Sequence, residues 1–288
     1  MTNSNLNKNM KKVLLSLAMA MALMTPSALQ AKVKHLLPKP QHITATENAA
    51  ALTLGGTVTI SYSGGAKKCD LLEEFFTTNG CKLVESGGTA VNVSLVESIE
   101  GAYDYELHGY ENEAYTLDVS ASGITITAIK PTGIIRAAQT LTQMAEGWDG
   151  QASLEAVSIK DWPAFKLRGY MHDVGRSFIS ADELVKQVKK FSRFKVNTFH
   201  WHMTENQAWR FEVKAYPELT YAESMTRFEG QYYTQDDCKR VLAAAKKHGM
   251  LVIPEIDMPG HSEAFQRAMG FGMQTEEGKV VLKKVLDE

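Results

Sequence analysis

The sequence predicts an α+β amino-terminal domain followed by the first three β/α units of a (β/α)8 TIM barrel. Residues 32–162 alternate short β-type runs with glycine-rich turns and include two helical patterns. After Pro163 the order becomes strand, helix, strand, helix, strand, helix, which is typical of parallel strands joined by crossover helices. The chain has 288 residues, 44% of them hydrophobic, which is enough for two such domains.

Residues 1–31 have the pattern of an export signal peptide. Lys8, Lys11 and Lys12 precede the apolar run 13–24, and small residues follow it as far as Ala31. The run is short for a membrane span, so we expect cleavage, a periplasmic or secreted protein, and no membrane partner afterwards. The formal net charge of −2 and the lack of a basic stripe argue against nucleic acid as a partner.

The small domain, residues 32–162, is predicted from β-type runs and helical periodicity. The runs TVTISYSGG, AVNVSLVES, AYTLDV and GITITAI predict strands. Helical patterns cover Cys69–Thr78 and Thr132–Ala145. In the second helix the residues expected to share a face are Ile135, Ala138, Leu141 and Ala145. No catalytic constellation is evident in this domain.

Three cysteines, Cys69, Cys81 and Cys238, do not make a disulfide framework or a zinc motif. A Cys69–Cys81 disulfide is possible in an oxidising compartment, and the sequence leaves that pairing open.

In residues 163–288 the runs FKLRGYMHDV, KVNTFHW and MLVIPEI predict three strands. Ser180 with Glu183 has the form of a capping box and begins a helix. Thr234 begins a second helix, which Gly249 can end in the left-handed conformation, and a third pattern covers Thr275–Glu288. No Gly-x-Gly-x-x-Gly follows a strand, so the pattern favours a barrel over a dinucleotide-binding doubly wound sheet.

Polar side chains gather at the carboxyl ends of these three strands, where barrels place their chemistry. Each group alone has a plain structural explanation as a strand cap, a set of ion pairs or a turn with solvated acids. Their occurrence in order at successive strand ends is more specific. The residues are Asp173 and Arg176 after the first strand, His200, His202 and Glu205 after the second, and Glu255, Asp257 and His261 after the third.

A metal-dependent hydrolase is one interpretation of this pattern. His200 and His202 could bind a cation together with His261, and Asp257 or Glu255 could supply further ligands. A His-x-His pair at a strand end resembles the metal-dependent amidohydrolases.

A second resemblance covers nearly all of the chain after the leader. The segments RGYMHDVGRSF, NTFHWHMTENQAWR and VIPEIDMPGHS resemble, in this order, the signature segments of the β-N-acetylhexosaminidases of glycoside hydrolase family 20. ENEAYTLDVSASGITITAIKPTGIIRAAQTLTQM is similar to the end of that family's small amino-terminal domain. The resemblance implies removal of terminal N-acetylglucosamine or N-acetylgalactosamine from a glycan by a substrate-assisted, retaining mechanism without metal or cofactor.

The resemblance also implies roles for individual residues. Arg168 would grip the hydroxyls of the terminal sugar. Glu205, at a position where the family often has aspartate, would hold His261, and His261 would support the general acid. We therefore expect the Glu205 carboxylate and a His261 ring nitrogen to lie about 2.7–3.2 Å apart, or to be bridged by one water. The remaining strand-end residues, Asp173, Arg176, His200, His202, Glu255 and Asp257, would support the site.

One part of the family pattern has no match. The catalytic Asp-Glu pair of the family ends the fourth barrel strand, whereas Asp287 and Glu288 lie in helical periodicity with no strand before them. We interpret Asp287–Glu288 as a solvated helix end, and the chain as a fragment that is inactive by itself. A further alternative is a non-catalytic sugar-binding protein that keeps Arg168 but not the acid.

Overall fold

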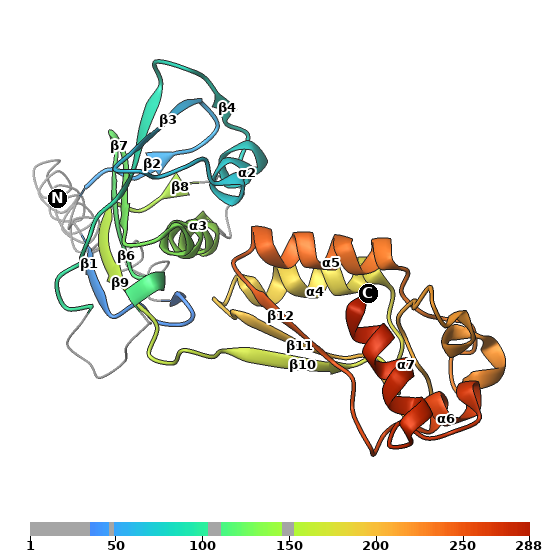
Figure 1. Cartoon of the computed structure of the whole chain (residues 1–288). Helices are drawn as coiled ribbons and strands as arrows, with labels where there is room; N and C mark the ends of the chain where they lie inside the picture. The colour runs from blue at the N-terminus through green and yellow to red at the C-terminus, as the bar shows by residue number, and fades with distance from the viewer. Residues whose placement is uncertain (1–34, 46–48, 103–110, 146–152) are drawn as a thin grey trace, which may run out of the picture.

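The computed structural model describes residues 35–45, 49–102, 111–145 and 153–288, so the expected signal peptide at 1–31 lies outside the described residues. These residues form an amino-terminal domain built on a mixed sheet and a carboxyl-terminal part built on a parallel sheet (Figure 1). Among the described residues, no helix has the length and apolar character needed to cross a membrane.

The mixed sheet has seven strands in the order β1-β9-β6-β7-β5-β3-β4. The four predicted strands are all present in it, as β3, β5, β6 and β7. Strand β9 comes from the end of the domain and pairs antiparallel with both β1 and β6, so residues far apart in sequence close the sheet. The strands are β1 (His42–Ala45), β3 (Thr57–Ser63), β4 (Lys82–Leu83), β5 (Thr89–Leu95), β6 (Tyr115–Ser120), β7 (Gly123–Ala128) and β9 (Val157–Asp161), with β2 (Leu52–Thr53) and β8 (Ser153–Leu154) forming a separate pair.

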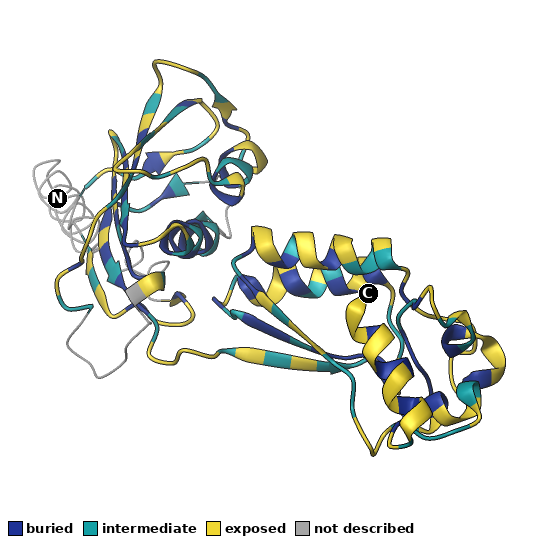
Figure 2. Cartoon of the chain, viewed as in Figure 1, coloured by how far each residue is buried: buried dark blue, intermediate teal, exposed yellow. Residues whose placement is uncertain are grey.

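Two helices, α2 (Asp70–Thr78) and α3 (Pro131–Ala145), contribute to the core of this domain, and a short turn of 3₁₀ helix, η3 (Glu111–Glu113), precedes β6. Both helices were predicted. Helix α3 is mostly buried (Figure 2). The burial extends beyond its apolar face, because Arg136, Gln139 and Thr140 are buried as well. Its polar side is covered by the carboxyl-terminal part, where the Arg136 guanidinium donates to the carbonyls of His248 and Gly249.

The three cysteines are free in the structure, so the open question of a Cys69–Cys81 disulfide is answered by two separate thiols. Cys81 is buried, and its sulfur accepts a hydrogen bond from the backbone N–H of Gly55 at 3.2 Å.

The carboxyl-terminal part begins with β10 and continues as alternating helices and strands. The three strands pair in parallel in the order β10-β11-β12, and their register places Asp173 beside His202 and His202 beside Glu255. The three strands and three of the helices were predicted, and α6 was not. The elements are β10 (Gly169–Asp173), α4 (Ala181–Ser192), β11 (Thr198–His202), η4 (Pro217–Thr220), η5 (Ala222–Ser224), α5 (Gln235–Lys247), β12 (Leu251–Glu255), α6 (Glu263–Met269) and α7 (Glu276–Asp287).

The helix ends follow the predicted chemistry with one difference. Thr234 and Asp237 form the reciprocal bonds of a capping box, and Gly249 has a φ of +64° after α5. At α4, the Ser180 side chain accepts a hydrogen bond from the Glu183 N–H, but the Glu183 carboxylate pairs with Lys186. The cap at Ser180 therefore has only the serine half of a capping box, and the Glu183 carboxylate instead pairs with Lys186 on the exposed side of the first turn.

The two faces of the parallel sheet differ in burial. On one face Phe199 and Trp201 are almost fully buried, in a core to which α4 and α5 contribute. On the other face Met171, Leu251 and Ile253 are exposed, by 55%, 62% and 39%. Both β10 and β12 are edge strands, so this sheet presents an apolar face and two open edges within the described residues.

A buried ion pair joins the two parts of the chain. The Lys195 ammonium lies 2.6 Å from the Asp161 carboxylate and 2.9 Å from the Tyr115 hydroxyl. Burial lowers the pKa of Lys195, and the negative charge of Asp161 acts in the opposite direction. Removing one charge from such a pair leaves the other buried and uncompensated.

We expect Lys195→Met to lower the free energy of unfolding by about 3–5 kcal/mol, because Asp161 then stays charged without its partner. Urea denaturation followed by tryptophan fluorescence measures the loss. The double variant Lys195→Met/Asp161→Asn is the control and should recover most of the stability. A loss below about 1 kcal/mol in the single variant would contradict a structural role for this pair.

The buried His248, at the carboxyl end of α5, makes stability depend on pH. Burial lowers its pKa from 6.5 to about 4, and Lys189, Lys247 and Arg136 act in the same direction. The unfolded chain takes up a proton near pH 6.5 while the folded chain resists it, so this contribution is present above pH 6.5 and is lost as pH falls towards 4. At 1.36 kcal/mol per pKa unit the total loss is on the order of 3 kcal/mol.

We therefore expect the unfolding midpoint in urea to fall steeply between pH 6.5 and pH 4. The variant His248→Gln keeps a polar side chain that does not titrate, and its midpoint should fall less over the same range. Equal slopes for the two proteins would assign the pH dependence to other groups.

Candidate functional site

Parallel pairing brings the carboxyl ends of β10, β11 and β12 to one edge of the sheet, and the predicted polar residues meet there. Asp173, His202 and Glu255 end neighbouring strands in register. The loops that follow carry Arg176, Glu205 and His261. Of the residues predicted for the site, all except Arg168 lie at this edge or in the loops after it.

Glu205 lies at the centre of one group. Its side chain is fully buried, and its Oε1 is in ion-pair contact with His261 Nδ1 and with an Arg176 guanidinium nitrogen. Arg176 also reaches Asp173 Oδ2 at 2.5 Å and lies 3.2 Å from His261 Nδ1. The expected proximity of Glu205 and His261 is confirmed, whereas the relay role remains a prediction.

Backbone geometry sets this contact. His261 has a φ of +52°, a left-handed conformation that is uncommon for a residue with a side chain. Glu205 fits beside Gly175 because glycine has no Cβ: an added Cβ would lie 2.4 Å from the Glu205 Cβ. The loop after β10 therefore leaves space for the acid that follows β11.

A second group surrounds Glu255. His202 Nδ1 lies 2.9 Å from Glu255 Oε2, and His200 Nε2 contacts the same oxygen. Partial burial raises the pKa of Glu255, but the hydrogen bond and positive charge offered by His202, with the help of His200, outweigh it and lower the pKa overall. One ligand atom each from His202, Glu255 and Asp257 lies within 4.8 Å of the others, so these residues could hold a metal ion.

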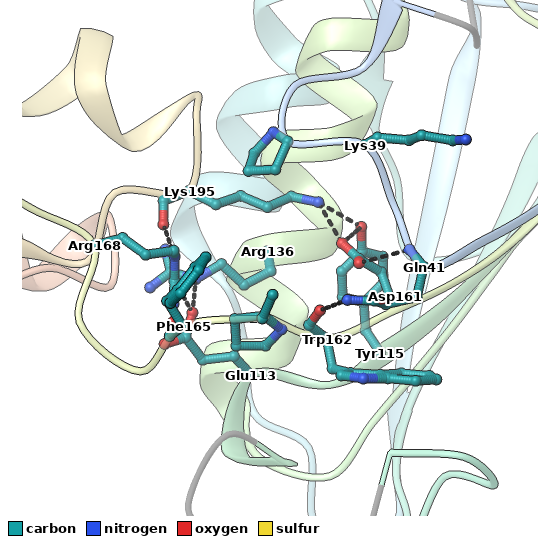
Figure 3. Close-up of a pocket in the computed structure, with 13 residues that line it drawn as sticks. Lys39, Gln41, Glu113, Tyr115, Arg136, Asp161, Trp162, Phe165, Arg168 and Lys195 are labelled. Carbon is teal, nitrogen blue, oxygen red and sulfur yellow. Dashed lines mark hydrogen bonds and ion pairs between the residues drawn. The ribbon is translucent and has the colours of Figure 1, made fainter. Parts of the chain in front are cut away.

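Arg168 lies elsewhere. It precedes β10, at the amino end of the strand that Asp173 ends, and four steps of about 3.3 Å separate the two ends of this strand. Its guanidinium pairs with Glu113 and donates to the carbonyls of Lys195 and Phe165 (Figure 3). These residues line a cavity of about 180 Å³ between the small domain and the parallel sheet. The structure thus does not bring Arg168 to the strand-end cluster.

Two residues without a predicted role, Arg210 near the site and Glu113 at the domain boundary, hold distant segments together. Arg210, the last residue of the NTFHWHMTENQAWR segment, is fully buried and donates to carbonyls in two loops, among them Val174 and Gly175 after β10. Burial lowers its pKa to about 10. The position of Arg210 in a segment that resembles a family signature could have indicated that it has a role in the site. Glu113, which contacts both Arg136 and Arg168, gave no such signal because its partners are distant in sequence.

Asp287 ends helix α7 and Glu288 follows it, which agrees with the interpretation of a helix end. Both residues are exposed, as expected for a solvated helix end, and Glu288 makes hydrogen bonds as well. Its carboxylate accepts hydrogen bonds from the backbone N–H groups of Lys214 and Ala215, both at 2.8 Å. Glu288 thus attaches the end of α7 to the loop after β11.

Comparison with known proteins agrees with this arrangement. Residues 165–285 match the glycosyl hydrolase family 20 catalytic domain, and residues 34–162 match domain 2 of the same family. The fold and the matched domains define the class as glycosyl hydrolase. More particularly, the chain belongs to glycosyl hydrolase family 20.

Individual relatives support the assignment. The chain is 31% identical over 256 residues to a beta-hexosaminidase of Vibrio furnissii, which covers 84% of this chain and 40% of the relative. It is similar to the crystal structure of a β-N-acetylhexosaminidase from Bacteroides fragilis, with a TM-score of 0.74 and 27% identity, covering 88% of this chain and 53% of the other. It is also similar to a Vibrio harveyi exo-β-N-acetylglucosaminidase solved with N-acetylglucosamine, with a TM-score of 0.67 and 27% identity over 83% of this chain and 38% of that one. The chain thus spans about two fifths to one half of the length of these relatives.

The space beside Gly175 leads to a test of the site's packing. We expect Gly175→Ala to lower the free energy of unfolding by about 1–3 kcal/mol, because the new Cβ displaces the buried Glu205. Gly260→Ala is a matched control in the same site, since an added Cβ there meets no atom within 4 Å. Equal urea midpoints for the two variants would show that Glu205 can move without cost.

Proposed function

We propose that this chain carries part of the active site of a β-N-acetylhexosaminidase, which removes terminal N-acetylglucosamine or N-acetylgalactosamine from glycans. The observation that carries the proposal is the contact between buried Glu205 and His261 at the strand ends. The resemblance to family 20 implies that an acid at this place orients a histidine. The Vibrio harveyi relative, solved with N-acetylglucosamine, supports the sugar specificity.

In this proposal each residue of the first group has a separate task. The Glu205 carboxylate accepts a hydrogen bond from the Nδ1–H of His261, which fixes the tautomer and leaves Nε2 to support the general acid. Asp173 orients Arg176 from the opposite side. The pKa of Arg176 is raised, chiefly by its hydrogen bond to Asp173, so the guanidinium stays charged.

Arg176 also fits the task of gripping sugar hydroxyls better than Arg168. Its side chain is 45% exposed beside Glu205 and His261, whereas that of Arg168 is 14% exposed and engaged at the amino end of β10. A planar guanidinium with unused donors suits a pair of neighbouring hydroxyl oxygens.

The finer architecture is part of the same proposal. We infer that further β/α units complete a (β/α)8 barrel, because β10 and β12 have open edges and the face with Met171, Leu251 and Ile253 is exposed. The carboxyl ends of β10, β11 and β12 bear no adjacent Asp-Glu pair. The proposed reaction therefore needs its acid pair from such units. Export to the periplasm or outside the cell is proposed from the leader pattern alone.

Hydrolysis of an aryl N-acetyl-β-glucosaminide tests this function. We expect no release of nitrophenol by the purified chain, because general-acid catalysis is worth about 10²–10⁴-fold and no acid is placed for it. A chimera that extends the chain by the β/α units of the Bacteroides fragilis structure that it does not match should release nitrophenol. Comparable turnover by the chain alone would place the acid among the residues described here.

Two conservative variants of the chimera separate the candidate sugar-binding arginines. Arg176→Lys should raise KM about tenfold or more, since lysine cannot make paired hydrogen bonds to two hydroxyls. Arg168→Lys should leave KM unchanged and lower stability through the Glu113 contact. The reverse outcome would assign sugar binding to Arg168. If the chain binds N-acetylglucosamine while the chimera fails to hydrolyse the aryl N-acetyl-β-glucosaminide, the non-catalytic alternative is favoured.

A further inference from the structure

Three side chains at the ends of β11 and β12 converge in a way that the proposed reaction does not use. One ligand atom each from His202, Glu255 and Asp257 lies within 4.8 Å of the other two. The Asp257 backbone N–H donates to Thr204 Oγ1 at 3.1 Å, which fixes the loop next to His202. Ligand atoms bound at about 2.1 Å to a tetrahedral cation are about 3.4 Å apart, so small side-chain movements suffice.

We propose that His202, Glu255 and Asp257 form a binding site for a divalent transition cation such as Zn²⁺, with His200 as a fourth ligand. The His200 Nε2 atom already contacts the Glu255 oxygen that faces His202. The His200 side chain is 41% exposed, so it has room to turn towards a cation. Imidazole nitrogens combined with carboxylate oxygens suit Zn²⁺ or Co²⁺, whereas Mg²⁺ and Ca²⁺ prefer all-oxygen sites.

The second ring nitrogen of His202 supports this site independently. His202 is more than nine-tenths buried, and its Nε2 has no hydrogen-bond partner. The Glu205 Oε1 atom lies 3.9 Å away from it. A metal-bound histidine usually donates its other N–H to a carboxylate, which fixes the tautomer. A cation on Nδ1 would place the proton on Nε2, which faces Glu205, and a movement of under about 1 Å would then bring the two into hydrogen-bond distance.

Charge and neighbours agree with a cation at this place. Glu255 and Asp257 place two carboxylates next to His202. Two carboxylates together balance a divalent charge. The cationic Arg176 is engaged with Asp173 and Glu205 and forms no ion pair with Glu255. His261 is engaged with Glu205, so the proposed ligand set differs from the one expected for a metal-dependent hydrolase in that it omits His261.

If no cation binds, His202 and Glu255 only form a hydrogen bond between β11 and β12, and Asp257 is a solvated aspartate beside them. Metal binding separates the two possibilities, and it does so whether or not the chain takes part in glycan hydrolysis. The experiment uses the purified chain without a histidine tag, titrated with ZnCl₂ in a calorimeter and with CoCl₂ in an absorption spectrometer.

We expect one Zn²⁺ per chain and visible Co²⁺ bands of four-coordinate intensity, with no binding of Mg²⁺. Asp257→Asn and Glu255→Gln should each weaken Zn²⁺ binding tenfold or more. Glu263→Gln, which changes an exposed carboxylate at the start of α6, is the matched control and should bind as the unchanged chain does. Circular dichroism checks that each variant is folded.

The proposal is overturned if the unchanged chain binds no Zn²⁺ at millimolar concentration, or if its Co²⁺ complex has only the weak bands of six-coordinate cobalt. It is also overturned if folded Asp257→Asn and Glu255→Gln bind Zn²⁺ as tightly as the control, because the metal then lies elsewhere. The Co²⁺ spectrum needs no variant, so the test remains decisive if a substitution prevents folding.

Discussion

The parallel pairing of β10, β11 and β12 is the constraint on which the site depends. Parallel strands carry their carboxyl ends to one edge, and the register sets Asp173, His202 and Glu255 side by side at the spacing of adjacent strands, about 4.8 Å. A slip of one residue in β11 would move His202 to the opposite face of the sheet and bring Trp201 to the face that carries Glu255. The burial of Phe199 and Trp201 under α4 and α5 opposes such a slip.

The charged groups at the two ends of this sheet are treated differently. At the amino ends Glu113 holds Arg136 and Arg168 in a largely buried network that joins the sheet to the small domain. At the carboxyl ends Arg176 and His261 keep nearly half of their side chains exposed around the buried Glu205. A network closed to solvent can stabilise an interface, whereas exposed donors around a buried acid remain available to a ligand. This contrast supports our proposal that the site lies at the carboxyl ends.

Much of this arrangement was predictable from the sequence, because periodicity and turn residues report local structure. The three parallel strands, the cap at Thr234 and the grouping of polar residues at strand ends followed from such patterns. The pairing of β9 between β1 and β6 and the buried polar side of α3 depend on contacts distant in sequence, which periodicity does not report. Arg168 shows the same limit: it stands in a signature segment, yet its position is set by Glu113, fifty-five residues away in another domain.

His202 connects the two groups at the strand ends, since its Nδ1 faces Glu255 while its Nε2 faces Glu205. An imidazole can donate from only one nitrogen when neutral, so the state of one group restricts the other. A cation held by Glu255 and Asp257 would direct the His202 proton towards Glu205, the same carboxylate that holds His261 and Arg176. By linkage, any ligand that reorients Glu205 would in turn change the affinity for the cation. If both proposals hold, the buried histidine would make metal binding and sugar binding at this edge mutually dependent, even though each uses its own side chains.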